Sequence, residues 1–254
     1  MAGVRAAILA AGRGVRMGGG TPKTLVPLDG GEPLLHHILE GLRTSGISDV
    51  LIVTGHRPNE ISDYVAQHSE GLEVTYVRNA RYASWGNFHS VRVALDQSPG
   101  YEVLVVNSDV VVHPDVYARV AGAPGDLVLA VEKKRVLDEE DMRVRLDGDR
   151  VLAIGKNLKR AHGHGEYAGV SLIRPPAARH YLDISTELEW SNNVDPYYED
   201  VYARLMELVE VRAVTVEPGH YAEVDTPEDV PRAVEVIERH RKAFAPAGSA
   251  DALT

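Results

Sequence analysis

Residues 9–23 read Leu-Ala-Ala-Gly-Arg-Gly-Val-Arg-Met-Gly-Gly-Gly-Thr-Pro-Lys and follow directly on an apolar segment of strand length. Glycines let the backbone approach a ligand closely and point several N–H groups at it. Arg13, Arg16 and Lys23 add positive charge to the same stretch. We therefore interpret it as an anion-binding loop at the end of a strand, the alternative being a flexible surface loop.

Two well-known phosphate-binding loops do not fit this stretch. The dinucleotide pattern Gly-x-Gly-x-x-Gly would need a third glycine where Met17 stands, and the P-loop pattern needs Gly-Lys-Ser/Thr, whereas Lys23 follows Pro22. The sequence therefore predicts a nucleotide-binding glycine loop of a third kind.

The sequence around this loop predicts an α/β fold with a largely parallel sheet, because apolar stretches alternate with helix-like segments. We expect strands at 4–11, 50–55, 73–77, 102–108 and 127–132, and helices at 33–45, 58–68, 87–96 and 114–121. The unbroken apolar runs at 51–53 and 103–106 are typical of central strands that are covered on both faces. Asp109 follows one of these runs, at the sheet edge where α/β proteins bind ligands.

After about residue 133 the sequence becomes more polar and predicts shorter strands with turns, in a mixed α+β region. We expect one more strand at 212–217 and a C-terminal helix at 226–241, which begins near Pro227. Residues 1–244 are interpreted as one domain, and residues 245–254 as a flexible tail without periodicity.

Composition excludes several classes of protein. The 254 residues are 44% hydrophobic and 25% charged, which is typical of a soluble globular chain. There is no cysteine, so disulfides and thiolate metal sites are excluded. The net charge of −10 argues against nucleic acid as a partner. The first apolar run is interrupted by Arg5 and is too short for a signal peptide or a membrane span, so we expect a cytoplasmic protein that does not bind membranes.

Residues 9–28 resemble the signature of nucleotidyltransferases with a Rossmann-like GT-A fold, in which Leu-Ala-Ala-Gly-x-Gly-x-Arg-Met is followed by Pro-Lys-x-Leu. The resemblance continues through Asn107-Ser108-Asp109, Lys156, Glu166-Tyr167-Ala168-Gly169-Val170 and the stretch 223–229. Residues 79–90 are similar to the corresponding segment of phosphocholine, inositol-phosphate and phosphonate cytidylyltransferases. The resemblance implies an NTP-binding half at about 1–132 and an acceptor-binding part at about 133–230.

This resemblance implies a Mg²⁺-dependent enzyme that transfers CMP from CTP to a small phosphonate or phosphoalcohol and releases pyrophosphate. It assigns nucleotide binding to Leu9, Ala10, Ala11, Gly12, Gly14, Asn87, Ser90 and Ser108. It assigns catalytic contacts to Arg13, Lys23 and Lys156, acceptor binding to Glu166, Tyr167, Glu199 and Asp200, and the metal to Asp109 and Asp225. Carboxylate oxygens are ligands that suit Mg²⁺.

The reaction that these roles imply requires few chemical groups from the protein. The attacking oxygen of a phosphate or phosphonate is already anionic near neutral pH, so no general base is needed. Charge neutralisation and positioning should dominate.

Several alternatives stay open at this level. Asp109 could be a turn residue, and Asp225 and Asn87 could be helix N-caps. The tyrosine- and acid-rich residues 190–200 could line an acceptor pocket or pack, and the loop 157–165 with His162 and His164 could cover the site. A sugar-1-phosphate nucleotidyltransferase that uses another NTP, and a non-catalytic nucleotide-binding regulatory protein, are the rival functions. Either a monomer or a homodimer is compatible with the sequence.

Overall fold

The computed structural model describes residues 3–14, 17, 20–29 and 31–244. Arg16 of the glycine-rich stretch and the expected tail at 245–254 lie outside the described residues.

A mixed sheet of nine strands forms the centre of the protein, in the order β3-β2-β1-β4-β9-β6-β10-β8-β7. Its strands are β1 (Val4–Ala10), β2 (Asp49–Thr54), β3 (Glu73–Arg78), β4 (Glu102–Asn107), β6 (Leu127–Lys133), β7 (Arg143–Asp147), β8 (Arg150–Ile154), β9 (Gly165–Ile173) and β10 (Val211–Val216). Strands β3, β2, β1 and β4 are mutually parallel, whereas β9 runs antiparallel to both β4 and β6. This is the expected α/β architecture, with a parallel half that is extended by a mixed half.

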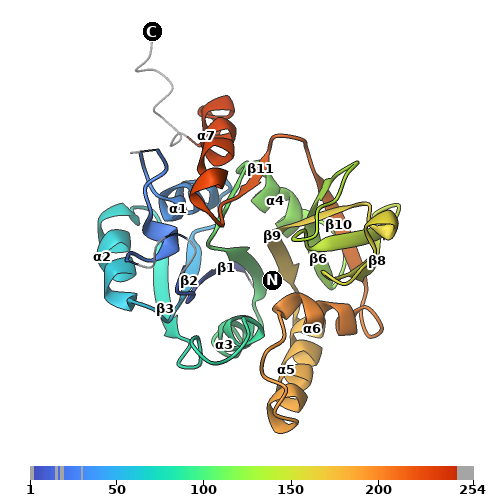
Figure 1. The fold of residues 1–254 in the computed structure, drawn as a ribbon. Helices are drawn as coiled ribbons and strands as arrows, with labels where there is room; N and C mark the ends of the chain where they lie inside the picture. Colours follow the sequence, from blue (N-terminus) through green and yellow to red (C-terminus); the bar gives the residue numbers. More distant parts are fainter. Residues whose placement is uncertain (1–2, 15–16, 18–19, 30, 245–254) are drawn as a thin grey trace.

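Helices cover both faces of this sheet (Figure 1). One core packs α1 (Leu34–Thr44), α2 (Pro58–His68) and α4 (Asp115–Gly122) against one face. The other packs α3 (Phe88–Asp96), α5 (Pro175–Trp190) and α6 (Tyr198–Leu205) against the opposite face. The apolar side chains of the central strands β2 and β4 are divided between the two cores, which explains why their sequences do not alternate between apolar and polar residues.

A small second sheet of two strands places the C-terminal part of the chain next to the segment that follows β4. Strand β5 (Val110–Val112) pairs antiparallel with β11 (Tyr221–Glu223), and helix α7 (Val230–Arg239) packs over this pair. The short 3-10 helices are η2 (Lys23–Leu25), η3 (Arg160–His162) and η4 (Pro227–Asp229).

Most of the predicted elements are confirmed to within a few residues, and two regions differ. Strand β9 is buried along all nine residues at the centre of the sheet, although this region was expected to hold short polar strands. Its glycines and Glu166 interrupt the continuous apolar run that would otherwise indicate a buried strand. The expected C-terminal helix is divided into η4 and α7, where the carboxylate of Asp229 accepts hydrogen bonds from the backbone N–H groups of Asp225 and Thr226.

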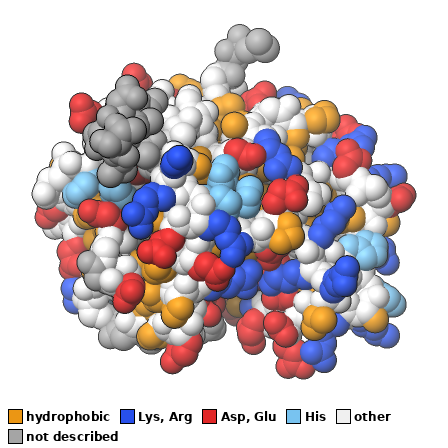
Figure 2. All heavy atoms as spheres, turned by 90° about the horizontal axis from the view of Figure 1, so that it is seen from above, with side chains coloured by type: hydrophobic (Ala, Val, Ile, Leu, Met, Phe, Trp, Pro, Cys, Tyr) orange, Lys and Arg blue, Asp and Glu red, His pale blue; other side chains and the backbone are white. Residues whose placement is uncertain are grey.

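The surface carries charges of both signs. On the face shown in Figure 2, Asp and Glu side chains are interspersed among Lys and Arg. Within the described residues, no helix combines the length and the apolar character that crossing a membrane would require.

Candidate active site

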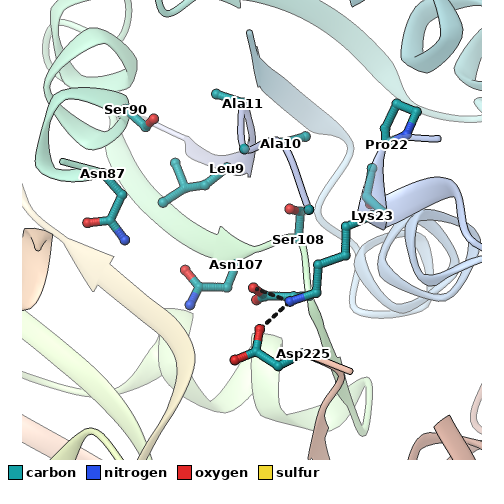
Figure 3. Close-up of a pocket in the computed structure, with 14 residues that line it drawn as sticks. Leu9, Ala10, Ala11, Pro22, Lys23, Asn87, Ser90, Asn107, Ser108 and Asp225 are labelled. Carbon is teal, nitrogen blue, oxygen red and sulfur yellow. Dashed lines mark hydrogen bonds and ion pairs between the residues drawn. The ribbon is translucent and has the colours of Figure 1, made fainter. Parts of the chain in front are cut away.

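A pocket of about 340 Å³ lies at the carboxyl ends of β1 and β4 (Figure 3). Residues from five segments line it: the end of β1, the glycine-rich loop with η2, the start of α3, the turn after β4 and the residue that follows Val224. The lining set is Leu9, Ala10, Ala11, Gly12, Gly14, Pro22, Lys23, Thr24, Asn87, Ser90, Asn107, Ser108, Asp109 and Asp225. The pocket, called the nucleotide pocket below, thus contains every residue to which the sequence assigned nucleotide binding.

Close packing between Gly14 and Lys23 shapes one wall of the nucleotide pocket. Gly14 has a φ of +55°, and a methyl group added there would lie 2.5 Å from Cβ of Lys23. Only glycine meets both demands without strain. Arg13, the preceding residue, is exposed and lies outside the pocket lining.

Lys23 joins two carboxylates at the bottom of the nucleotide pocket. Its Nζ donates to Asp109 Oδ2 at 3.1 Å and to Asp225 Oδ1 at 2.5 Å. Burial lowers the pKa of Lys23, but the two carboxylates outweigh it and the net pKa is raised. The lysine therefore stays protonated and holds the two aspartates together.

The pairing of β5 with β11 explains how these two distant aspartates meet. Asp109 immediately precedes β5, and Asp225 lies two residues after β11. The backbone N–H of Val224 donates to the carbonyl of Asp109 at 2.8 Å and extends the pairing beyond the two strands. The antiparallel register therefore brings the two carboxylates to the same end of the small sheet.

Glu223 completes a group of three acids that could hold a metal ion. One carboxylate oxygen each of Asp109, Glu223 and Asp225 lies within 4.8 Å of the others. Burial, followed by the charges of Asp109 and Asp225, raises the pKa of Glu223 to about 8. In addition, Oδ1 of Asp109 is buried without a hydrogen-bond partner. Three close carboxylate groups, one of which also carries an unsatisfied oxygen, fit a hard divalent cation.

Sequence reasoning assigned Asp109 and Asp225 to the metal but missed Glu223. A signal was present, because Glu223 and Asp225 are separated by one residue in an extended segment and therefore point to the same side.

The segment 79–90 forms the opposite wall and is organised by the buried side chain of Asn79. Its Nδ2 donates to Ser90 Oγ at 2.9 Å, and its Oδ1 accepts from the backbone N–H of Arg81.

Asn87 stands at the N-cap position of α3, yet its Oδ1 accepts from the backbone N–H of Tyr198 at 2.8 Å. It therefore fastens α6 to α3. Trp85 stacks against Phe88, lies beneath the guanidinium of Arg81, and is absent from the pocket lining.

Gly86 allows this segment to approach the acidic loop before α6. Its N–H donates to the carbonyl of Val194 at 2.6 Å, and a methyl group at Gly86 would lie 2.0 Å from the carbonyl oxygen of Pro196. The two loops are therefore in backbone contact, which joins the two halves of the protein.

A second, larger pocket of about 560 Å³ adjoins the first and shares Asn87, Asn107, Asp109 and Asp225 with it. We call it the acceptor pocket. Four residues that the sequence assigned to acceptor or catalytic contacts line it: Lys156, Glu166, Tyr167 and Glu199. The remaining residue that was assigned to the acceptor, Asp200, lies outside the lining, where its carboxylate accepts from the backbone N–H of Tyr197 and caps α6.

Lys134 is a second residue that sequence reasoning missed. Its Nζ is paired with Glu166 and lies 3.4 Å from Asp141 Oδ1. Burial raises the pKa of Glu166 to about 7, although the lysine opposes the shift. Lys156 is more exposed, with Nζ 3.2 Å from Glu140 and 5.7 Å from the ring centre of Tyr197.

The tyrosines of this region divide between the core and the pocket. Tyr198 and Tyr202 are fully buried, and Tyr198 donates its hydroxyl to Asn107 Oδ1 at 2.8 Å. Tyr197 is about half exposed and lines the acceptor pocket. His164 is tied to β7, since its Nδ1 accepts from the backbone N–H of Leu146.

The family comparison matches most of the chain. Residues 6–182 match the family described as MobA-like NTP transferase domain. A bifunctional IPC transferase and DIPP synthase of Rubrobacter xylanophilus is 33% identical over 241 residues, which are 92% of this chain and 52% of that protein. A CMP-5'-(3-aminopropyl)phosphonate synthase of Streptomyces rubellomurinus is 35% identical over 173 residues, 65% of this chain and 26% of that protein. The chain thus spans about half or less of these relatives.

Solved structures share the fold. The inositol-1-phosphate CTP transferase from T. maritima superposes with a TM-score of 0.76 at 20% identity, covering 92% of this chain and 96% of that one. The CTP:phosphocholine cytidylyltransferase LicC from Streptococcus pneumoniae gives a TM-score of 0.72 at 22% identity, covering 92% and 99%. At these identities the similarity concerns the fold.

Proposed function

The chain belongs to the family of MobA-like NTP transferase domains, and we propose that it is a Mg²⁺-dependent cytidylyltransferase acting on a small phosphonate or phosphoalcohol. The observation that carries this proposal is the position of Lys23, Asp109 and Asp225. They lie in the nucleotide pocket, and both aspartates also line the acceptor pocket. A reaction that joins a nucleotide to a second small molecule needs charged groups at such a junction.

The proposed step is an in-line displacement at the α-phosphorus of CTP. An anionic oxygen of the acceptor's phosphate or phosphonate forms the new P–O bond, and the bond to pyrophosphate breaks. Because the attacking oxygen is already ionised, the protein holds and neutralises the reacting groups without taking up a proton. The products are the CMP conjugate and pyrophosphate.

The chain's own cations divide between the two substrates. Lys23 is buried, protonated and within the nucleotide pocket, so we assign it to the triphosphate. Lys156 lines the acceptor pocket and is paired with Glu140, which is exposed, so we assign it to the acceptor phosphonate or the α-phosphate. Arg13 is exposed beside the glycine loop, where it would meet the outer phosphates.

Asp109, Glu223 and Asp225 would hold the divalent cation, which when bound neutralises the converging phosphate charges. The fit rests on their close oxygen atoms, on the unsatisfied Oδ1 of Asp109, and on the burial and mutual repulsion that raise the pKa of Glu223. Lys23 partly offsets that repulsion.

The choice of CTP rests on similarity. The Streptomyces relative is named as a synthase of a CMP phosphonate, and it aligns with about two thirds of this chain. The end of β1, at Leu9, Ala10 and Ala11, is the part of the pocket that we assign to the base.

Pyrophosphate release in the presence of Mg²⁺ tests the proposal. CTP, UTP, GTP and ATP are each paired with 2-aminoethylphosphonate, 2-hydroxyethylphosphonate, phosphocholine, inositol phosphate and glucose 1-phosphate. We expect turnover with CTP and at least one phosphonate or phosphoalcohol. Turnover only with glucose 1-phosphate would replace the proposal by a sugar-phosphate nucleotidyltransferase.

A further inference from the structure

The two pockets share two amide side chains as well as two carboxylates. Besides the two aspartates, Asn87 and Asn107 line both the nucleotide pocket and the acceptor pocket. A neutral amide carries both N–H donors and an acceptor oxygen, and only the donors attract an anion. An amide at this junction therefore favours phosphate groups only if its oxygen is occupied by the protein.

One residue occupies the oxygen of both amides. The backbone N–H of Tyr198, at the start of α6, donates to Oδ1 of Asn87 at 2.8 Å. The hydroxyl of Tyr198 donates to Oδ1 of Asn107, also at 2.8 Å. Tyr198 is fully buried and lies outside the lining of both pockets. Any contribution of Tyr198 to ligand binding must therefore act through the two asparagines.

The surroundings of the Tyr198 hydroxyl fix it as the donor to Asn107. An amide oxygen can only accept, so the single hydroxyl proton must lie in this hydrogen bond. Burial raises the pKa of Tyr198 well above its ordinary value, so the phenol keeps that proton. The hydroxyl oxygen also lies 3.2 Å from that of Tyr167, which in turn lies 3.0 Å from Oγ of Ser171. The hydrogen bond to Asn107 thus belongs to a buried network that holds the hydroxyl in place.

This hydrogen bond leaves Nδ2 of Asn107 available to a ligand. Among the described residues, Nδ2 of Asn107 donates to no protein group. The amide packs beside Gly169 of the acceptor pocket, where a methyl group would lie 3.1 Å from Nδ2. In Figure 3 the side chain of Asn107 extends toward Asn87 and away from Lys23. The free donor group therefore lies at the border between the two pockets.

The orientation of this amide matters for the proposed reaction. The α-phosphate and the attacking oxygen both bring negative charge to the junction of the pockets, and an N–H donor held there in advance stabilises that charge. The same amide rotated by half a turn would present Oδ1 and repel it. Because the terminal torsion of asparagine has two broad wells of similar shape, the side chain alone does not select between them. The hydroxyl of Tyr198 does.

We propose that Tyr198 is a positioning residue whose hydroxyl holds Oδ1 of Asn107, so that Nδ2 of Asn107 donates to the oxygen atoms of the α-phosphate during the transfer. This inference rests on the proposed function, because it assigns a role within that reaction. No proton leaves either side chain. The amide contributes a hydrogen bond that is oriented before the reaction begins.

A double-mutant cycle tests the coupling between these two side chains. The values of kcat and of KM for CTP are measured with the acceptor of the panel above that the wild type uses best. We expect Tyr198→Phe to lower kcat about 10-fold and to change the KM for CTP less than about 3-fold. Asn107→Ala should lower kcat about 100-fold. The double variant should be no slower than Asn107→Ala, because the hydroxyl acts only through the amide.

Tyr202→Phe is the matched control. It removes another buried hydroxyl of the same network, whose oxygen lies 2.8 Å from Oγ of Ser171, and this hydroxyl makes no hydrogen bond to Asn107. We expect Tyr202→Phe to keep kcat within about 3-fold of the wild type. An equal loss in Tyr198→Phe and Tyr202→Phe would show a general structural role and overturn the proposal, as would full activity of Tyr198→Phe.

A spectroscopic measurement tests the same orientation without turnover. In NMR spectra of nitrogen-labelled protein, the side-chain amide signals of Asn107 are identified by their absence from Asn107→Ala. We expect addition of CTP and Mg²⁺ to shift these signals in the wild type and to shift them less in Tyr198→Phe, where the amide is free to rotate. Equal shifts in the two proteins would overturn the proposal.

The outcomes separate this inference from the proposed function. Turnover by the wild type, together with losses that multiply in the double variant, would leave a cytidylyltransferase in place and overturn the role of Tyr198. Silence of the wild type with every acceptor would instead refute the proposed function, and with it the role of Tyr198 in the transfer.

Discussion

The two pockets that share Asp109 and Asp225 are built in different ways. The nucleotide pocket is lined largely by backbone and small side chains at the strand ends of the parallel half, and its charged residues are Lys23 and the two shared aspartates. The acceptor pocket is lined by charged side chains from β9, α6 and the small sheet, and from the segments that follow β6 and β8. Under the proposed function, the first pocket would hold the nucleoside triphosphate and the second the acceptor.

The two pockets also differ in how the charges of their buried carboxylates are compensated. In the nucleotide pocket, the carboxylates of Asp109 and Asp225 are compensated by Lys23. In the acceptor pocket, Glu199, Glu166 and Glu223 all have a raised pKa, in each case chiefly because of burial. Buried acids held in this way destabilise the protein alone and are relieved by ligands.

Neutralising Asp109, which lines both pockets, should have the largest effect on activity. Asp109→Asn removes a charge that both pockets use, and we expect kcat to fall about 1,000-fold. The thermal unfolding temperature should not fall, because one of three mutually repelling acids is lost. Asp147→Asn, at the exposed end of β7, is the matched control. Normal pyrophosphate release by Asp109→Asn would remove this residue from the reaction.

Removing the compensating cation, Lys23, should weaken binding of the nucleotide. Lys23→Met should raise the KM for CTP about 100-fold, because charged hydrogen bonds to phosphate are lost. The remaining acids should then bind Mg²⁺ more tightly, so that Mg²⁺ raises the unfolding temperature more in the variant than in the wild type. Lys133→Met, exposed at the end of β6, serves as control. An unchanged KM would contradict the assignment of Lys23 to the triphosphate.

The backbone of the glycine loop can be tested with a matched pair. Gly14→Ala places a methyl group against Cβ of Lys23 at a positive φ, and we expect the KM for CTP to rise about 10-fold through displacement of the loop. Gly20→Ala meets nothing within 4 Å and should behave as the wild type. Equal kinetics for the two variants would show that the close packing of Gly14 is unimportant.

The smallest expected effect is the contribution of Glu199, in the acceptor pocket, to the pH dependence of the free energy of unfolding. The pKa of Glu199 is about 7 in the folded protein and about 4.5 when unfolded, so the native state binds more protons in between. Its contribution to stability is complete below pH 4.5 and is lost as the pH rises through 7. From pH 6 to pH 8 the loss should be about 1 kcal/mol.

Denaturant unfolding at these two pH values measures this contribution. Glu199→Gln should lack it and so lose less stability between pH 6 and pH 8 than the wild type. Glu207→Gln, an exposed change that follows α6, should retain the wild-type dependence. Identical slopes in all three proteins would show that Glu199 is ionised throughout and would make the two pockets electrostatically alike.

Local patterns predicted the parallel half and its pocket well. The glycine loop, the apolar runs of β2 and β4 and the helices between the strands are each read from consecutive residues. All eight residues expected to bind the nucleotide line one pocket, because the ends of neighbouring parallel strands meet at one edge of a sheet. Contact with a nucleotide stays a prediction for each of them.

The acceptor side was harder to predict for a physical reason. Its lining comes from strands that pair antiparallel across long separations, so Lys134, Glu166 and Glu199 meet only after β9 has inserted between β4 and β6. Asp200 and Glu199 illustrate this limit, because they are neighbouring acids that the sequence does not distinguish. In the structure Glu199 lines the acceptor pocket, whereas the carboxylate of Asp200 caps α6.

The sequence by itself determined the fold class, because that depends on residue types and spacing within single elements; the anion-binding role of the glycine loop and the metal-binding role of the two aspartates stay predictions. The tertiary structure alone decided that Lys23 bridges those aspartates, that Glu223 joins them, and that Glu199 is buried with no ion pair to a lysine or arginine among the described residues. These facts depend on burial and on charges brought together from distant segments. A linear pattern carries neither, because the local dielectric and the neighbouring charge of a side chain exist only once the chain has packed.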